Sequence, residues 1–499
     1  MKKNDNFAFC FLTNSCFIMC ALTRFLTAFF FLFTQNAYTQ VAIERFLSPS
    51  YMKGASISLM VKDILNDSIV YCYYANRELI PASVMKVVTT AAALEILGDQ
   101  FRYETALLYD GVLNNGILDG NLYIRGSGDP TLGSSEITAD RDKIMHEWIK
   151  SLKQSGIRMI TGAVISDESV FDSHGHSMKI LLEDMGSYYS QGSYGINIFD
   201  NRFTLFMQTG DADVKPEILK TEPDMPAIIF HNHLSSNTFA RDSMYITGYP
   251  FSNERYLYGT IPSNRSSYLL RGDIPEPSLF LAQYFTGLLE NDSIKVSGTP
   301  SCYRVLVQNN GWNNMERKFL FSSFSVPMKE IVRVTNHVSH NLYADVLLKT
   351  IGLKRDNEGT HSSFDKGIST VKNHLSQKGL NTSSLWMFDG SGLAVADKLT
   401  ASFLCDLLDY MYNRSSYSDT FIYSLPRAGI EGTVANLLRN SKLHGNLRIK
   451  SGSMSRVRSY AGYYVKDDQV YAIALIVNNF SCTQTQMRID IERLFLSLF

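Results

Sequence analysis

The stretch Ser83-Val84-Met85-Lys86 opens an apolar run, Val87 to Leu97, which ends at Gly98. This pattern predicts a helix with a buried start. Three residues make nearly one helical turn, so Ser83 and Lys86 should lie on the same face. A serine acyl-transfer reaction needs such a pair, because a hydroxyl group is a poor nucleophile until a neutral amine takes its proton.

Lys86 must be uncharged to act in this way. The pKa of an unperturbed lysine is about 10.4, so the site has to lower it by burial or by nearby positive charge. Alone, the S-x-x-K pattern is weak evidence, since a serine at this position is more often a helix N-cap followed by a solvated lysine.

A second polar stretch, Ser339-His340-Asn341, precedes the helical run Leu342 to Ile351. Residues two apart do not share a helix face, so Ser339 and Asn341 can converge only from a loop or a helix cap. The simpler interpretation is that the serine caps the following helix.

A third stretch, Lys450-Ser451-Gly452-Ser453, lies within a predicted strand from Leu447 to Met454. In a strand the two serines should point to one face and the lysine to the other. The glycine leaves room for another backbone or a ligand. The alternative interpretation is a strand end with small polar residues.

In this order, S-x-x-K, S-x-N and K-[ST]-G resemble the signature set of penicillin-binding proteins and serine β-lactamases. The long stretch between the first two motifs is similar to that of the class C low-molecular-mass penicillin-binding proteins, the D-alanyl-D-alanine carboxypeptidase/endopeptidases of the penicillin-binding protein 4 type. The resemblance runs from about residue 41 to the C-terminus. Further stretches that carry it are Gly126-Ser127-Gly128-Asp129-Pro130, Asp389-Gly390-Ser391-Gly392-Leu393, Gly429-Ile430-Glu431-Gly432-Thr433 and Tyr460-Ala461-Gly462-Tyr463.

The resemblance implies a role for each residue of the first two motifs. Ser83 would be the acylated nucleophile and Lys86 its general base. Ser339 would relay a proton to the leaving amine, and Asn341 would bind the substrate amide or position the lysine.

The third motif would bind the substrate. Lys450 would lower the pKa of Lys86 and attract the terminal carboxylate, which Ser451, Gly452 and Ser453 would hold. The backbone N–H groups of Ser83 and Ser453 would form the oxyanion hole.

The implied reaction is attack on a D-Ala-D-Ala carbonyl group of a peptidoglycan stem peptide, loss of D-Ala and hydrolysis of the acyl-enzyme. The same chemistry would cut D,D-crosslinks, and β-lactams would inhibit covalently. No metal or cofactor is required. One departure concerns Ala394-Val395, where the family often has Ser-Arg. Val395 cannot pair with a charged side chain of the stem peptide as an arginine could.

Two other enzyme or binding functions are compatible with the sequence. A β-lactamase or esterase on the same fold would differ in deacylating fast, and a non-catalytic cell-wall scaffold would keep only a vestigial site. Two histidine pairs, His174-Gly175-His176 and His231-Asn232-His233, are better explained as surface or loop pairs than as metal ligands.

At 499 residues the chain is too long for one core. Its net charge of −1 does not point to nucleic acid as a partner. Predicted hairpins at 56–74 and 459–477 flank helical segments, which favours an α+β fold: a split transpeptidase/β-lactamase-like domain, with an antiparallel sheet covered by helices and a large β-rich insertion. The expected catalytic domain is 40–105 plus 322–499, and the insertion is 106–321, in two subdomains.

Residues 1–39 begin with basic residues and contain the apolar run Phe25 to Phe33, as secretory signals do. We therefore expect an exported protein of the periplasm or cell envelope. An uncleaved segment would instead give peripheral membrane association, and both alternatives stay open, as does the oligomeric state. The scattered cysteines beyond this segment favour buried free thiols over a disulfide framework; they are Cys72, Cys302, Cys405 and Cys482.

Overall fold

The computed structural model describes residues 41–239, 242–354 and 362–499. The predicted export signal at 1–39 lies outside these residues. Within the described ranges, no helix has the length and apolar character to cross a membrane. The described cysteines are free thiols: Cys302 and Cys405 are buried as expected, whereas Cys72 is exposed and Cys482 is partly exposed.

An antiparallel sheet of five strands forms the centre of the catalytic part, in the order β2-β1-β22-β21-β20. Both predicted hairpins are confirmed, and β1 at the N-terminal side pairs with β22 at the C-terminal side from Ser56–Asn478 to Asp63–Tyr471. Segments from the two ends of the described chain therefore complete one sheet. Its strands are β1 (Ser56–Asp63), β2 (Ser68–Tyr73), β20 (Leu447–Met454), β21 (Val457–Lys466) and β22 (Gln469–Asn478).

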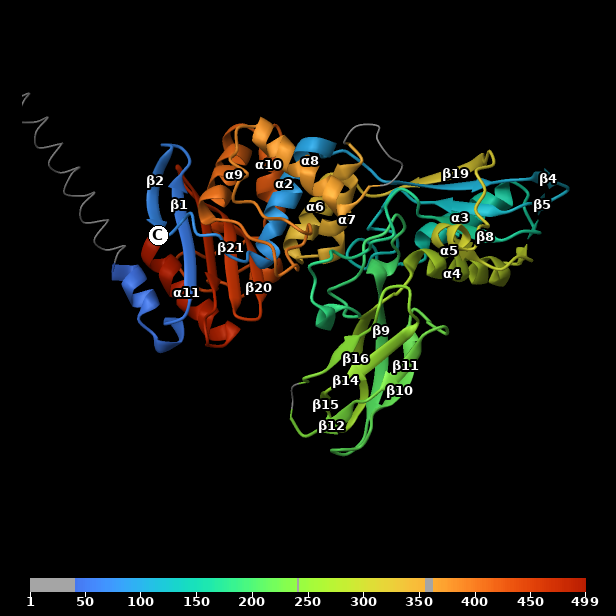
Figure 1. Cartoon of the computed structure of the whole chain (residues 1–499), viewed down its shortest axis with the longest axis horizontal. Helices are drawn as coiled ribbons and strands as arrows, with labels where there is room; N and C mark the ends of the chain where they lie inside the picture. The colour runs from blue at the N-terminus through green and yellow to red at the C-terminus, as the bar shows by residue number, and fades with distance from the viewer. Residues whose placement is uncertain (1–40, 240–241, 355–361) are drawn as a thin grey trace, which may run out of the picture.

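Helices pack on both faces of this sheet. Alternate residues of a strand point to opposite faces, so one strand contributes side chains to both cores. On β22, Leu475 faces a core shared with α11 (Gln484–Leu498), whereas Ala474 faces a larger core shared with the other helices. The layers are visible in Figure 1. The helices of the larger core are α2 (Met85–Leu97), α6 (Met328–His337), α7 (Asn341–Gly352), α8 (Phe364–Gln377), α9 (Ala401–Asn413) and α10 (Ser418–Ser424).

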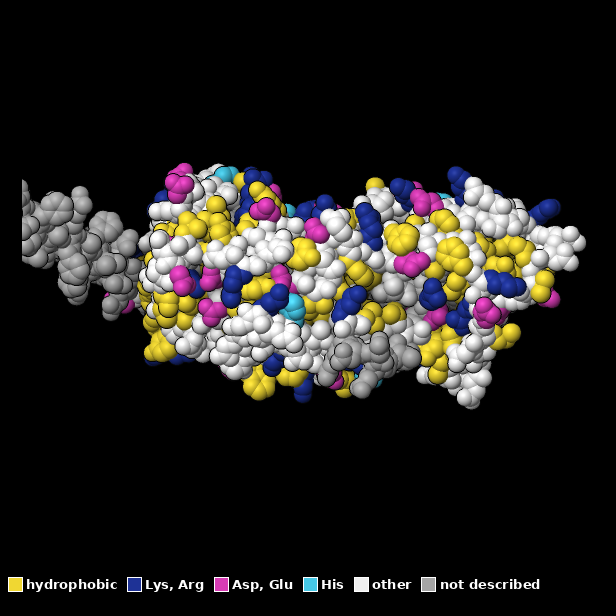
Figure 2. All heavy atoms as spheres, turned by 90° about the horizontal axis from the view of Figure 1, so that it is seen from above, with side chains coloured by type: hydrophobic (Ala, Val, Ile, Leu, Met, Phe, Trp, Pro, Cys, Tyr) yellow, Lys and Arg dark blue, Asp and Glu magenta, His cyan; other side chains and the backbone are white. Residues whose placement is uncertain are grey.

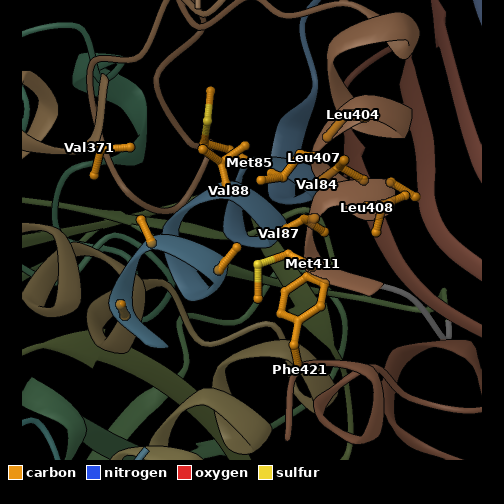
Figure 3. Packing of buried hydrophobic residues seen from close by; sticks show 14 of the residues in the cluster. Val84, Met85, Val87, Val88, Val371, Leu404, Leu407, Leu408, Met411 and Phe421 are labelled. Atoms are coloured by element: carbon orange, nitrogen blue, oxygen red, sulfur yellow. The ribbon is translucent and has the colours of Figure 1, made fainter. Parts of the chain in front are cut away.

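Helix α2 lies in the middle of that core and is buried on nearly every side. Figure 3 shows Val84 and Val87 against Leu404 and Leu408 of α9, with Phe421 of α10 nearby. A helix that is apolar all round is buried all round. The start of α2 is consequently held by packing rather than by capping, and no side chain caps it.

The insertion begins and ends on two neighbouring antiparallel strands, β3 (Glu104–Tyr109) and β19 (Lys318–Phe324). Its first part contains the sheets β18-β8-β6-β3-β19 and β17-β7-β5-β4. Its helices include α3 (Lys143–Gln154) and α4 (Pro277–Asn291). The other elements of this part are β4 (Val112–Asn114), β5 (Ile117–Asp119), β6 (Leu122–Arg125), β7 (Met159–Ile160), β8 (Val164–Asp167), β17 (Lys295–Val296), β18 (Ser301–Cys302) and α5 (Tyr303–Gln308).

The second part of the insertion consists of small sheets that project from the long axis of the molecule (Figure 1). We propose that the catalytic domain and the insertion divide at 105/106 and 321/322. Strand β3 runs across the first of these boundaries, and β19 runs across the second. The strands of this part are β9 (Arg202–Thr209), β10 (Glu217–Glu222), β11 (Ile229–Asn232), β12 (Ser235–Asn237), β13 (Tyr245–Thr247), β14 (Glu254–Tyr258), β15 (Thr260–Pro262) and β16 (Arg265–Asp273).

The surface seen from above carries basic and acidic side chains interspersed with apolar ones (Figure 2). This mixture agrees with the net charge of −1. On that face no stripe of one sign extends over the molecule.

Candidate active site

The serine and lysine of the first motif lie together as predicted. Ser83 belongs to the short helix η2 (Ala82–Val84), directly before α2, and its Oγ atom is 2.9 Å from the Nζ atom of Lys86. The lysine is fully buried, while Ser83 keeps partial exposure. The hydroxyl group therefore faces an open space, and the amine lies behind it.

The second motif converges on the first through an unusual turn. Ser339 has a φ of 61°, in the left-handed region that a non-glycine residue rarely adopts. The simple N-cap interpretation of this serine is wrong, because His340 is the N-cap residue of α7 and makes no capping bond with its side chain. Lys86 donates to Oδ1 of Asn341 over 2.6 Å.

The third motif joins from the edge strand β20. The Nζ atom of Lys450 lies 2.9 Å from Oγ of Ser339 and 2.7 Å from the Ser451 carbonyl oxygen. Gly452 is required by close packing, since a Cβ atom there would overlap the Ser459 hydroxyl group and lie 2.7 Å from the Pro81 carbonyl oxygen. The strand can therefore approach the residues just before Ser83.

The two serines of this motif have different surroundings. The Ser451 hydroxyl group is 2.8 Å from that of Thr433, a residue to which we assigned no role from the sequence. Ser453 is exposed and lines the same cavity as Ser83.

Burial controls the charge of both lysines. It lowers the pKa of Lys86 to about 8, against the opposing effect of Asp345, Asp389 and Asp397. It also holds the pKa of Lys450 well below the usual range, with a further contribution from the charge of Lys86. The lowering expected for the pKa of Lys86 is due to burial, and the contribution expected from Lys450 is not among its causes.

A loop that the sequence analysis left without a role completes the lysine's environment. The carbonyl oxygen of Ser391 accepts from Lys86 over 2.7 Å. Asp389 fixes this loop by accepting from the backbone N–H groups of Gly392, over 2.6 Å, and Ala394, over 2.7 Å. The signal was present in the sequence, because Asp389 and Ser391 belong to one of the stretches that carry the family resemblance.

These contacts orient the Lys86 amine. A neutral amine has two N–H groups and one lone pair, and both Asn341 Oδ1 and the Ser391 carbonyl oxygen are acceptors only. When they take the two N–H groups, the lone pair is left for the hydroxyl proton of Ser83. The geometry is that of a base facing its nucleophile.

The motifs open into a cavity of about 490 Å³. One wall comes from the insertion, and Asn341 donates through Nδ2 to the carbonyl oxygen of Tyr189 over 2.7 Å. The cavity is lined by Ile80, Ser83, Leu181, Glu183, Asp184, Tyr189, Ser339, Asn341, Gly392, Leu393, Val395, Ser453, Met454, Ser455 and Val457.

A buried network also ties the second motif to the insertion. Nε2 of His340 lies 3.3 Å from Oδ1 of Asp200, whose other oxygen is 3.0 Å from Arg202. Burial alone would raise the pKa of Asp200, but the hydrogen bond from His340 and the charge of Arg202 hold it well below the usual range. The insertion thus helps to place Ser339 and Asn341.

Comparison with known proteins agrees with this geometry. The model of the D-Ala-D-Ala carboxypeptidase 3 (S13) family matches residues 39–494. The chain belongs to this family. It is therefore a hydrolase of the serine-type D-Ala-D-Ala carboxypeptidases, as the resemblance implied.

Individual relatives are distant but extensive. The chain is similar to the D-alanyl-D-alanine carboxypeptidase of Actinomadura sp. (strain R39), with 26% identity over 454 residues that cover 88% of this chain and 80% of the relative. The crystal structure of penicillin-binding protein 4 from Haemophilus influenzae matches with a TM-score of 0.75 and 23% identity, covering 89% of this chain and 96% of that one. The same protein complexed with a β-lactam gives a TM-score of 0.71 at 21% identity, covering 89% and 96%. These structures confirm the predicted fold.

Proposed function

We propose that this protein removes the terminal D-Ala from peptidoglycan stem peptides and cuts D,D-crosslinks through an acyl-enzyme on Ser83. The supporting observation is that a buried lysine of lowered pKa, about 8, faces the Ser83 hydroxyl group at 2.9 Å. The other motif residues surround this pair from α7 and β20.

In the acylation step Lys86 takes the hydroxyl proton as Ser83 attacks the carbonyl carbon. The N–H groups of Ser83 and Ser453 stabilise the oxyanion, where each donor is worth about 3–4 kcal/mol in the transition state. Ser339, 2.9 Å from Lys450, relays the proton that Lys86 took from Ser83 to the amine of the departing D-Ala, which leaves Lys86 neutral again for deacylation. Water then hydrolyses the ester, with Lys86 as the base.

The terminal carboxylate of the substrate is assigned to the third motif. An anion beside Lys450 would favour its ammonium form and offset the effect of burial. The Ser453 hydroxyl group, which lines the cavity, and the hydroxyl pair of Ser451 and Thr433, 2.8 Å apart, are the hydrogen-bonding groups that we assign to this carboxylate.

The charged residues among the described lining of the cavity are Glu183 and Asp184. Val395 also lines it and carries no charge. We therefore propose that a stem residue with a free side-chain amine is preferred, whereas a carboxylate at that position gains no partner from Val395.

Labelling with a fluorescent penicillin tests the nucleophile. Wild-type protein should become covalently labelled and Ser83→Ala should not. Ser455→Ala is the matched control, because Ser455 lines the same cavity outside the motifs. Absence of label on the wild type would leave the non-catalytic scaffold, and rapid loss of label with release of penicilloate would favour a β-lactamase.

Incubation with a muropeptide digest, followed by mass spectrometry, tests the substrate. Loss of one D-Ala from pentapeptides shows carboxypeptidase action, and conversion of crosslinked dimers to monomers shows endopeptidase action. Products of neither kind from a protein that binds penicillin would overturn the proposed substrate. The envelope location proposed from residues 1–39 is tested by fractionating cells that express the full chain.

A further inference from the structure

Three carboxyl groups lie near the buried amine of Lys86, which belongs to α2. Asp345 comes from α7, one turn after Asn341, and Asp389 and Asp397 come from the loop 388–397. In its ionised form each of them would raise the pKa of Lys86. None of them has a role in the mechanism above.

Asp345 holds the loop in place. Its Oδ1 atom accepts from the backbone N–H of Gly390 over 2.8 Å. The next residue, Ser391, supplies the carbonyl oxygen that accepts from Lys86, and its side chain also bonds to Asp345. Thr89 of α2 donates to the Gly390 carbonyl oxygen over 2.7 Å. The loop is thus fixed between the two helices that carry the first and second motifs.

The cluster cannot hold three negative charges at low cost, because like charges in a buried site resist joint ionisation. Asp389 accepts three backbone N–H groups, from Ser391, Gly392 and Ala394. Burial, followed by the charge of Asp389, raises the pKa of both Asp345 and Asp397 well above the usual range. Asp389 is therefore the member best placed to carry the negative charge.

We propose that Asp345 is a positioning residue for acylation that works in its protonated form. As a neutral carboxyl group it orders the loop, so that the Ser391 carbonyl oxygen takes one N–H of Lys86. It adds no second negative charge that would hold Lys86 as an ammonium ion. This proposal rests on the proposed role of Lys86 as base.

Other charged groups near the cluster also affect the protonation of Lys86 and its carboxyl neighbours. Lys349 follows Asp345 by one helical turn and lies 2.9 Å from Asp172, so its charge is partly engaged elsewhere. Lys450 of β20 also interacts with Lys86 through its charge. The groups to be considered together are Lys86, Asp345, Lys349, Asp389, Asp397 and Lys450.

The test compares Asp345→Asn with Asp345→Ala. Asparagine is neutral, can accept from Gly390 and can donate as a protonated carboxyl group does. The rate of Ser83 acylation by a fluorescent penicillin is measured between about pH 6 and about pH 9.5. We expect the acylation rate of Asp345→Asn to stay within about threefold of the wild type, with the rate reaching half its maximum at the same pH. The rate of Asp345→Ala should fall by about tenfold or more at every pH, because this variant loses the bonds to Gly390 and Ser391.

Two outcomes would overturn the proposal. A half-point about one pH unit lower in Asp345→Asn would mean that the wild-type residue is ionised. Wild-type rates in Asp345→Ala would mean that the loop needs no support from it. Asp409→Asn, a carboxylate paired with Lys62 at 2.8 Å and outside the cavity lining, is the control for the substitution itself.

An infrared difference spectrum gives a readout that does not depend on activity. Wild type minus Asp345→Asn at about pH 8 should contain a protonated carboxyl band, and a carboxylate band in its place would contradict the proposal. Labelling of Ser83→Ala separates failure of the proposed function from failure of the inference about Asp345. If that variant is labelled, the proposed function fails. If it is unlabelled and only the Asp345 results disagree, this inference alone fails.

Discussion

The pH dependence of acylation follows directly from the burial of Lys86. With a pKa of about 8, about one tenth of this lysine is uncharged at pH 7, against roughly one in 2,500 for an exposed lysine. The buried site therefore holds about 230 times more of the basic form, equivalent to roughly 3 kcal/mol. Acylation should rise about fivefold from pH 7 to pH 8 and less than twofold from pH 8 to pH 9.

The assay is the rate of covalent labelling by a penicillin whose own charge is constant over this range. A rate that reaches half its maximum near the pKa of a free lysine, or a rate that does not change with pH, would refute the assignment of Lys86 as base.

The stability of the protein gives an independent check of the lowered pKa of Lys86. Because the folded-state pKa lies below the unfolded one, the unfolded chain binds more protons between about pH 8 and about pH 10.4, so the free energy of unfolding rises with pH there. Relative to Lys86→Met, the wild type should gain up to about 3 kcal/mol across this window in urea unfolding.

Three further perturbations test the surroundings of the site. Gly392→Ala should lose acylation and about 3 kcal/mol or more of stability in urea unfolding, because its Cβ atom would overlap backbone atoms at a φ of +79°. The control Gly379→Ala has a φ of +88° and no atom within 4 Å of the added Cβ, so it should lose only about 1–2 kcal/mol. Equal losses in the two variants would contradict the steric argument. Replacing Glu183 and Asp184 by Gln and Asn should lower kcat/KM about fivefold for a stem peptide with a free side-chain amine and leave its acetylated analogue unchanged; equal effects on both would exclude a role for charge. Asp200→Asn should cost about 2–3 kcal/mol of stability above pH 4, measured by urea unfolding, and the difference should shrink as pH falls through the low pKa of the wild-type carboxyl group. A constant difference down to pH 2 would show that the charge of Asp200 contributes nothing.

The local parts of the fold were predictable because local pattern determines them. The predicted strand, Leu447 to Met454, has the same bounds as β20 in the structure. The first motif was equally accessible, since Ser83 and Lys86 are related by one helical turn. In each case the information lies within a few neighbouring residues.

Features that depend on distant contacts were not predictable in the same way. The left-handed backbone of Ser339 is imposed by its surroundings, and no local pattern marks a serine for it. Asp345 looks like an ordinary polar residue of a helix until the loop that it holds is placed beside it. The wall formed by residues such as Tyr189 depends on how the insertion folds back over α7, which follows from tertiary packing alone.

That wall has a consequence for antibiotics. The segment 181–189 borders the cavity but belongs to the insertion, so it can accumulate substitutions without altering any residue of the three motifs. Discrimination between β-lactams with different side chains is then free to evolve separately from the acylating machinery. Substitutions that change β-lactam selectivity can therefore lie far along the chain from Ser83, in a segment outside the three motifs.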